Sequence, residues 1–274
     1  MTLKDALAAA AALGLARLDA QVLLLHVLRR EPGERGWLLA HDTDPLAPAL
    51  EDAFGQLARR RAAGEPVAYL TGEKEFFGLA LRVDARVLVP RPDTETLVEW
   101  ALQVLRERSA PRIVDLGTGS GAIALALQSA RPDAWVEAVD RSAEALAVAA
   151  ANASRLGLPV HLRQASWLDG AGRYDLIASN PPYIAEDDPH LPALRHEPRA
   201  ALAAGPDGLD DLRAIAAAAP SHLAPGGWLL VEHGWEQAAA VRALLAAAGF
   251  VDVASRRDLA GIERCSGGRR LELG

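Results

Sequence analysis

Apolar residues recur at helical spacing through about the first seventy residues of the chain. The segments Leu3–Leu13, Leu18–Arg30 and Ala47–Ala63 are rich in Ala, Leu and Arg, and their apolar positions repeat with the helical period. Gly14, Gly64 and the residues around Pro32 separate these segments. No run in this part of the sequence has strand-like composition, so the pattern predicts a small helical bundle at residues 1–70.

The pattern changes near residue 67. Three short runs with strand-like composition follow: Val67–Leu70, Glu75–Phe77 and Leu79–Val83. Gly78 lies between the last two runs and marks a turn. The sequence therefore predicts a β-hairpin linker at residues 71–89. The prolines and acidic residues of Pro90–Glu95 then indicate the start of a helix over Thr94–Arg108.

From Pro111 onward, strand-like and helix-like segments alternate. The predicted strands are Ile113–Leu116, Trp135–Val139, Val160–Arg163, Tyr174–Ser179, Trp228–Glu232, Val251–Ser255 and Arg269–Leu273. The predicted helices are Gly121–Ser129, Ser142–Leu156, with Ser142 as N-cap and Gly157 at its end, and Trp235–Ala248, closed by Gly249. Repeated strand–helix units predict a parallel, doubly wound α/β sheet, which makes residues 90–274 one α/β domain.

Composition and charge narrow the classes of function. The chain of 274 residues carries 29 basic and 36 acidic residues and has a net charge of −7. This charge argues against broad binding to nucleic acid or anionic lipid, and it leaves a local basic patch open. The single cysteine, Cys265, excludes an internal disulfide and a cysteine-built zinc site. We expect no metal, and we expect Cys265 to be a packed or loop residue.

No apolar run has the length of a membrane span. The run Ala6–Ala16 is as long as a signal-peptide core and follows Lys4, but Asp5 directly precedes it and Ala outnumbers Leu within it. We therefore expect an amphipathic first helix, a cytoplasmic location and no membrane partner.

A glycine-rich turn provides the first candidate site. Gly117-Thr118-Gly119-Ser120-Gly121 follows a predicted strand and opens a helix, and Asp140 ends the next strand nineteen residues later. Such a turn lets a nucleotide approach the backbone, and the carboxylate can take both ribose hydroxyls. The spacing differs from G-x-G-x-x-G, and Asp115 precedes the turn, so the cationic ligand S-adenosylmethionine is favoured over NAD. A turn that packs without ligand is the bland alternative.

A second motif, Asn180-Pro181-Pro182-Tyr183, ends the fourth predicted strand. Proline lacks an N–H, so this segment offers carbonyl acceptors and almost no donors. The Asn180 side chain and the Pro181 carbonyl could hold both protons of a planar amino group, and Tyr183 could stack on its face. Methyl transfer to that nitrogen would then depend on orientation and electrostatics rather than on a strong base. A loop that only terminates a strand is the alternative.

Together these segments resemble the HemK/PrmC family of protein-glutamine N5-methyltransferases over nearly the whole chain. The segments that carry the resemblance are Pro90–Glu95, Leu97–Glu99, Asp115–Leu125, Asp140–Ser142, Ser179–Ile184, Glu197–Leu202 and Gly205–Leu209. The resemblance implies a Rossmann-like S-adenosylmethionine-dependent methyltransferase fold with a small N-terminal helical bundle. It also implies methylation of the glutamine in the Gly-Gly-Gln loop of class 1 peptide-chain release factors, which modulates translation termination and leaves S-adenosyl-L-homocysteine.

The resemblance also implies roles for single residues. Gly117–Gly121 would cradle the methionine portion of the cofactor, Asp140 would bind the ribose, and Trp167 would lie beside the adenine. Asn180 would touch both cofactor and substrate, and Pro181, Pro182 and Tyr183 would bind the glutamine. The domains implied are a release-factor-docking domain at 1–70, the linker at 71–89 and a methyltransferase domain at 90–274. We expect a monomer that does not bind nucleic acid directly.

Two other functions remain open on the sequence. A DNA or RNA amino-group methyltransferase of the adenine-N6 type shares Asn-Pro-Pro-Tyr, although the net charge of −7 counts against it. A cofactor-sensing module without catalysis would not need the Asn180–Tyr183 segment. Several residues have open roles between substrate contact and ordinary surface or capping positions: Arg59, Arg60, Arg61, Glu95, His190, His196 and Glu197.

Overall fold

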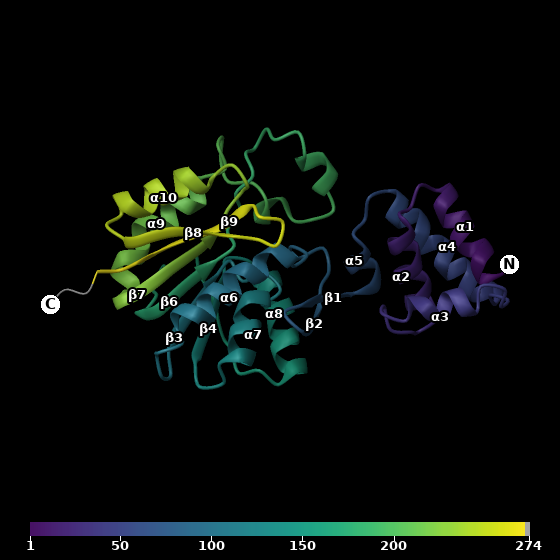
Figure 1. The fold of residues 1–274 in the computed structure, drawn as a ribbon, viewed down its shortest axis with the longest axis horizontal. Coiled ribbons are helices and arrows are strands. Elements are labelled where there is room, and N and C mark those ends of the chain that lie inside the picture. The colour runs from purple at the N-terminus through teal and green to yellow at the C-terminus, as the bar shows by residue number, and fades with distance from the viewer. Residues whose placement is uncertain (272–274) are drawn as a thin grey trace. The chain divides into compact units, whose positions relative to one another are not determined.

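The computed structural model describes residues 1–271. The chain divides into two compact units, Met1–Glu73 and the part from Lys74 onward. We call the first the helical unit and the second the sheet unit (Figure 1). The structure supports the α/β fold class with a helical N-terminal region. Within the described residues, no helix has both the length and the apolar character needed to cross a bilayer.

The helical unit contains five helices: α1 (Leu3–Ala12), α2 (Arg17–Val27), α3 (Arg35–Ala40), α4 (Pro48–Ala62) and α5 (Val67–Thr71). Thr2 and Asp5 form a reciprocal capping box at the start of α1. Leu23, Leu24 and Phe54 lie in the buried core. The three helices predicted here are confirmed, and α3 is an additional short one.

The strand predicted at Val67–Leu70 is wrong, because these residues form α5. Its composition suggested a strand, but Pro66 precedes the helix as its N-cap and Gly72, at φ 77°, ends it in the left-handed region. Leu70 is buried in the core of the helical unit, and this packing stabilises the helical turn.

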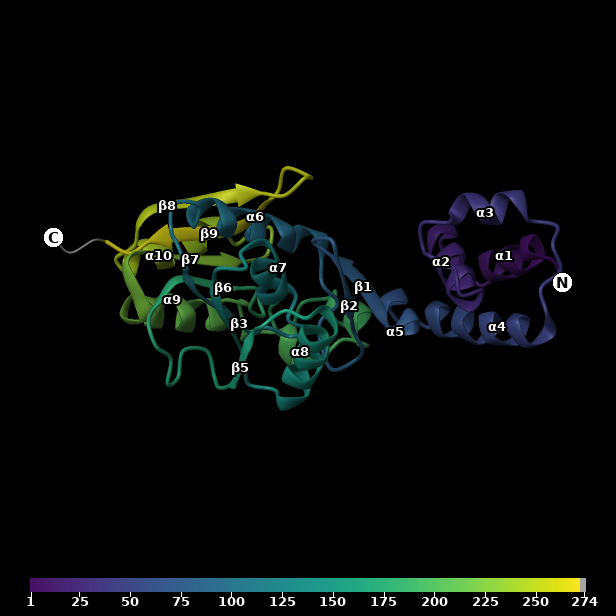
Figure 2. The ribbon, with the colours of Figure 1, turned by 90° about the horizontal axis from the view of Figure 1, so that it is seen from below.

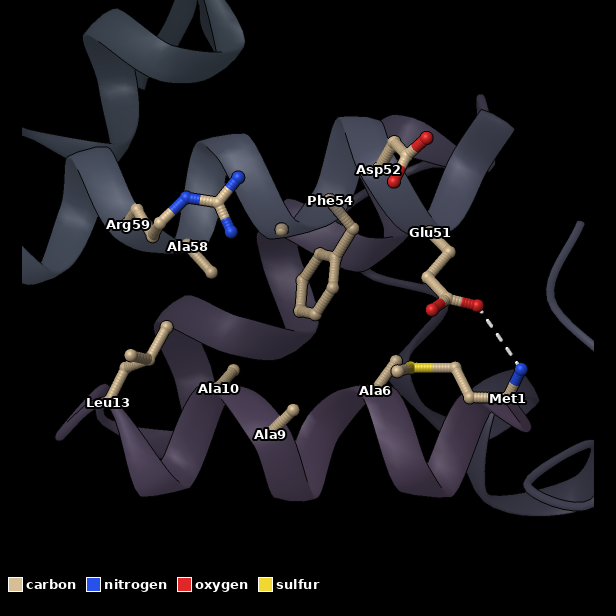
Figure 3. A pocket seen from close by; sticks show the side chains of 11 residues that line it. Met1, Ala6, Ala9, Ala10, Leu13, Glu51, Asp52, Phe54, Ala58 and Arg59 are labelled. Carbon is tan, nitrogen blue, oxygen red and sulfur yellow. Dashed lines mark hydrogen bonds and ion pairs between the residues drawn. The ribbon is translucent and has the colours of Figure 1, made fainter. Parts of the chain in front are cut away.

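A small hollow of about 220 Å³ lies between α1 and α4 in the helical unit (Figure 3). Ala6, Ala10 and Phe54 line its apolar part. At one end the Met1 amino group lies 3.2 Å from Glu51, and Arg59 lies at the other end (Figure 3).

A hairpin and a helix lead into the main sheet. Strands β1 (Glu73–Phe76) and β2 (Leu79–Arg82) pair as a two-stranded sheet, as the predicted hairpin requires. Both turn residues, Phe77 and Gly78, have positive φ, which is the geometry of a tight two-residue hairpin turn. The 3₁₀ turn η1 (Pro92–Thr94) then leads into α6 (Glu95–Val104), which ends four residues before the predicted boundary.

The described part of the sheet unit has one seven-stranded sheet, in the order β5-β4-β3-β6-β7-β9-β8. Its strands are β3 (Arg112–Leu116), β4 (Trp135–Asp140), β5 (His161–Gln164), β6 (Tyr174–Ser179), β7 (Leu223–Glu232), β8 (Val251–Arg257) and β9 (Glu263–Arg269). Strands β3 to β7 pair in parallel, as predicted.

The last two strands correct the prediction of a wholly parallel sheet, because β9 pairs antiparallel with both β7 and β8. Only a short turn joins β8 to β9, and a parallel pair would need a long crossover connection. The strand predicted at Arg269–Leu273 is also misplaced, since β9 ends at Arg269. Residues 272 and 273 of that prediction lie outside the described residues.

Helices cover both faces of the sheet (Figures 1 and 2). On one face α6, α7 (Ala122–Ala130) and α8 (Ala143–Leu156) pack on the strands, and on the other α9 (Asp210–His222) and α10 (Ala238–Ala247). Alternate strand residues serve the two faces: Ile113 packs in one apolar cluster and Val114 in the other. Helix α9 and the 3₁₀ turns η2 (Leu191–Leu194) and η3 (Arg199–Ala201) were not predicted.

Candidate active site

A cavity of about 420 Å³ lies where the strand order reverses, at the carboxyl ends of β3, β4 and β6. Open parallel sheets bind ligands at this edge, and the volume is typical of small-molecule sites. The lining includes the sequence-predicted Gly117, Gly119, Asp140, Trp167, Asn180 and Pro182, together with Ala85, Arg86, Val87, Leu88, Arg141, Ser142, Pro198, Ala200 and Ala201. The structure therefore brings both motifs to the walls of one cavity.

The glycine-rich turn after β3 is built on three residues with positive φ: Gly117, Gly119 and Gly121. A Cβ added at Gly119 would meet nothing within 4 Å, so this part of the backbone faces open space. A Cβ at Gly117 would come within 3.3 Å of the Trp167 ring, and one at Gly121 within 3.0 Å of Leu125. The first two glycines line the cavity, and the third leaves room for the side chains of Leu125 in α7 and Ala149.

Thr118 and Ser120, the remaining residues of the turn, are buried and hold it in shape. The Thr118 hydroxyl donates to Asp115 Oδ2 at 2.6 Å. The Ser120 carbonyl accepts from Asn152 Nδ2 at 2.9 Å. The same Asn152 amide group accepts from the Arg82 N–H in β2 and donates to the Arg82 carbonyl. Asn152, a fully buried helix residue, was not singled out in the sequence, because its partners lie far along the chain.

Asp115, the acid that precedes the turn, does not line the cavity among the described residues. The carboxyl group is fully buried, and its Oδ2 also accepts from the Ala124 backbone N–H at 3.2 Å. Burial raises the pKa of Asp115 to about 7, against the lowering effect of these hydrogen bonds. Its Oδ1 has no hydrogen-bond partner in residues 1–271. The side chain thus ties the turn to the start of α7.

Asp140 ends β4 and lines the cavity, as predicted. Its Oδ2 accepts from the Gly119 N–H at 3.0 Å and its Oδ1 from the Ser142 N–H at 2.9 Å. These bonds fix the carboxylate beside the turn. The ring of Trp167, which follows β5 with φ 45°, forms another wall.

The Asn180–Tyr183 segment follows β6. Asn180 Nδ2 donates to Thr94 Oγ1 at 3.2 Å, which leaves Asn180 Oδ1 as the atom not engaged by Thr94. Pro181 and Pro182 are buried. The Tyr183 ring packs on the apolar cluster under α9 and α10, and its hydroxyl donates to Glu232 Oε1 at 3.3 Å. Tyr183 is therefore anchored from below the segment.

The residues with open roles fall into structural positions. Glu197 accepts from the Val89 N–H and from Arg91, and Glu95 accepts from the Phe77 N–H, so both tether the segment that leads into the cavity wall. Cys265 is buried in β9, as expected, and burial raises the pKa of its thiol. Neither His190 nor His196 is among the described residues that line the cavity. His190 is exposed and pairs with Asp188.

The cavity fits S-adenosylmethionine. Its walls combine an open glycine backbone, a carboxylate for a ribose, and Leu88 with the Trp167 ring for a flat base. Within residues 1–271, no group of three or more His, Cys, Asp or Glu side chains gathers as a metal-binding cluster. A doubly wound sheet with this site defines a Rossmann-like S-adenosylmethionine-dependent methyltransferase.

Comparison with known proteins gives the family. The family description "PrmC N-terminal domain" matches residues 2–72, and "Methyltransferase small domain" matches residues 94–197. A protein of Bordetella pertussis named release factor glutamine methyltransferase is 57% identical over 260 residues, covering 93% of this chain and 95% of that protein. One of the same name from Xylella fastidiosa is 53% identical, covering 96% and 97%. The chain belongs to the release factor glutamine methyltransferase family.

Solved structures agree on the fold. A methyltransferase from Pyrococcus furiosus superposes with a TM-score of 0.54 at 19% identity, covering 72% of this chain and 91% of that one. At that identity the likeness concerns the fold alone.

Proposed function

We propose that the protein transfers a methyl group from S-adenosyl-L-methionine to the side-chain nitrogen, N5, of the glutamine in the Gly-Gly-Gln motif of class 1 release factors. The carrying observation is that Asn180, the first residue of the acceptor-rich segment, lines the same cavity as Asp140 and the glycine-rich turn. A single side chain can then touch both donor and acceptor. The name shared by relatives of 53–57% identity supports release factors as substrates.

The cofactor supplies an electrophilic methyl group on a sulfonium. In our proposal Gly117 and Gly119 hold its methionine portion, Asp140 its ribose and Trp167 its adenine. Thr118, Ser120 and Gly121 act on this site by fixing the shape of the turn.

The chain's own task at the acceptor is orientation. An amide nitrogen is a poor nucleophile because its lone pair is delocalised into the carbonyl. In our proposal Asn180 Oδ1 and the Pro181 carbonyl accept the two amide protons, which turns the lone pair toward the methyl group and favours attack. As the new N–C bond forms, the bond between the methyl group and sulfur breaks and S-adenosyl-L-homocysteine leaves. The amide nitrogen then releases one proton to water. Buried Pro181 and Pro182 keep competing N–H donors out of this place.

The helical unit, in this proposal, docks the release factor. Two of the three arginines at the end of α4 have partners within the unit: Arg60 pairs with Glu65 and Arg61 with Asp19. Arg59 lines the hollow between α1 and α4 (Figure 3), so it is the arginine of this run that we assign to contact an acidic surface.

An amino-group methyltransferase acting on nucleic acid remains the alternative, because Asn-Pro-Pro-Tyr also suits an adenine amino group. The net charge of −7 disfavours it. A monomeric state and a cytoplasmic location stay predictions.

The test is labelling. The protein is incubated with S-adenosylmethionine carrying a labelled methyl group and with an unmethylated class 1 release factor, and the label is mapped by peptide mass spectrometry. We expect one methyl group on the Gly-Gly-Gln glutamine and none when that glutamine is replaced by alanine. Label on duplex DNA or on RNA, with none on the release factor, would replace this proposal by the alternative. Calorimetric binding of the cofactor without turnover on any of these acceptors would favour a sensing module.

A further inference from the structure

A buried carboxyl group lies beneath the Asn180–Tyr183 segment and takes no part in the mechanism described so far. Glu232 ends β7 with 1% of its surface exposed. Its Oε1 accepts from the Tyr183 hydroxyl at 3.3 Å. The Thr94 hydroxyl lies close enough to the carboxyl group to act to lower its pKa. Glu232 Oε2 has no hydrogen-bond partner in the part of the chain that the structure describes. Burying a polar atom without a hydrogen bond lowers the stability of the fold. A carboxyl group that is kept at this position therefore indicates a role other than stability.

The hydrogen bonds have a direction. Asn180 Nδ2 donates to Thr94 Oγ1, so the one hydroxyl proton of Thr94 is free to be donated onward to Glu232. Tyr183 donates to the same carboxyl group. A hydrogen-bond acceptor at Glu232 therefore orients the hydroxyls of Thr94 and Tyr183. With its proton directed toward Glu232, Thr94 accepts from Asn180 Nδ2, so Asn180 Oδ1 is the amide atom that remains for the substrate.

We propose that Glu232 is a positioning residue for methyl transfer: it orients the Asn180 amide through Thr94 and holds Tyr183 directly. This proposal rests on the function proposed above, since it concerns how Asn180 presents Oδ1 to the acceptor. Residues just after Glu232 secure the same segment, because Gln237 Nε2 donates to the Tyr183 carbonyl at 3.0 Å.

The fold offers a matched pair for comparison. Glu137 on β4 accepts a hydrogen bond from the Tyr174 hydroxyl on β6, and it is also buried. Glu137, however, forms an ion pair with Arg163 at 2.8 Å and does not line the cavity among the described residues. A buried carboxyl–tyrosine pair away from the cavity is thus present in the same sheet, and Glu137→Gln is the control.

Charged and titratable groups around Glu232 come from three elements. Asp93 lies on η1, Tyr183 follows β6, and Arg264 and Cys265 lie on β9. Burial raises the pKa of Glu232 to about 7, with Asp93 adding to the rise and Arg264 opposing it. The neighbouring His233 ring bonds Ser266 and the Gly234 carbonyl, and burial lowers its pKa. Protonation of Glu232 below about pH 7 would place a donor where two hydroxyls need an acceptor.

The experiment compares Glu232→Gln, Thr94→Val, the double variant and Glu137→Gln with the unaltered protein. Initial rates are measured on an unmethylated class 1 release factor, S-adenosylmethionine binding by calorimetry, and unfolding by heat. We expect kcat to fall about 10–100-fold in Glu232→Gln, the loss typical of a misplaced reacting group, while the cofactor Kd changes less than about threefold. Thr94→Val should fall similarly, the double variant no further, and Thr94→Ser should restore most of the rate.

The pH profile gives an independent reading. In the unaltered protein kcat should decline below about pH 7, and in Glu232→Gln this decline should disappear. An unchanged kcat and pH profile in Glu232→Gln, with the unaltered protein active, would overturn the inference and leave the proposed function intact. Equal losses in Glu232→Gln and Glu137→Gln would also overturn it, because packing would then explain both. An unaltered protein that does not label the release factor would instead refute the proposed function.

Discussion

Two buried carboxyl groups lie beneath the two halves of the site, and they are held in different ways. Asp115, beneath the glycine-rich turn, bonds Thr118 and Ala124, three and nine residues away. Glu232, beneath the Asn180–Tyr183 segment, accepts from Tyr183 and lies near the Thr94 hydroxyl, and both residues belong to other parts of the chain. Burial raises the pKa of each to about 7. The carboxyl group beneath the cofactor half is therefore held by near neighbours in the sequence, and the one beneath the acceptor half is surrounded by segments that only the assembled fold brings together.

The two halves of the site should therefore be distinguished by different measurements. The turn and Asp140 act on cofactor binding, so their variants should change the cofactor Kd. Asn180 and the residues that orient it act on the transfer step, so their variants should change kcat.

Asn180→Ala should produce the largest effect. The substitution removes the side-chain oxygen that accepts a hydrogen bond from the substrate glutamine amide. Losing an oriented group of this kind costs about 10²–10³-fold in kcat. The side chain is partly exposed at the cavity wall, and its hydrogen bond to Thr94 is a single long one of 3.2 Å, so the fold should persist. Single-turnover labelling of the release factor measures the rate, and calorimetry measures cofactor binding. A Kd that weakens as much as kcat falls would break the division.

Asp140→Ala should weaken cofactor binding about 10–100-fold, because a hydrogen bond to a charged group contributes about 1.5–3 kcal/mol. The variant also removes the hydrogen bonds that the carboxylate accepts from the Gly119 and Ser142 N–H groups. At saturating cofactor the kcat should fall far less than in Asn180→Ala. Asp133→Ala serves as the control: its carboxyl group, at the other edge of the sheet, bonds Arg131 and the Ala110 N–H. Cofactor affinity that is equal in the two variants would contradict the assignment of Asp140.

The same division explains how much the sequence could predict. The glycine-rich turn, Asp140 and Asn180 were predictable because each is part of a contiguous motif at the end of a predicted strand, and parallel strands end at one edge. The contact of Glu232 with Thr94 was not, because it joins two segments that only the sheet order brings together. Glu197 and Asn152 were obscure for the same reason: each bonds a backbone group far away in the sequence.

Two helices show a different limit. In α5 the strand-like composition of Val67–Leu70 was outweighed by Pro66, Gly72 and the burial of Leu70. Helix α9 contains Pro220 and a run of alanines, which weaken the helical period that the sequence could show. In both cases tertiary packing decided what local preference left undetermined.

The smallest predicted effect concerns stability, and it applies to both halves alike. A carboxyl group with a pKa raised on folding is protonated in the native state while it is ionised in the unfolded chain. Between its unfolded pKa, near 4, and about 7, the folded protein therefore holds the extra proton, and the free energy of unfolding falls as pH rises. The stabilising contribution is complete below pH 4 and is lost by about pH 7.

Each group adds a slope of up to about 1.4 kcal/mol per pH unit in this window. Asp115→Asn and Glu232→Gln should each remove one proton from that slope, and the double variant should remove two, because the sites share no partner. Urea unfolding at several values between pH 4.5 and 7.5 measures the differences from the unaltered protein, so that carboxyl groups with lowered pKa, such as Asp84, cancel. A slope that Asp115→Asn leaves unchanged would mean that Asp115 is ionised beneath the turn. The cofactor half would then carry a fixed negative charge, and only the acceptor half would hold a carboxyl group that titrates near pH 7.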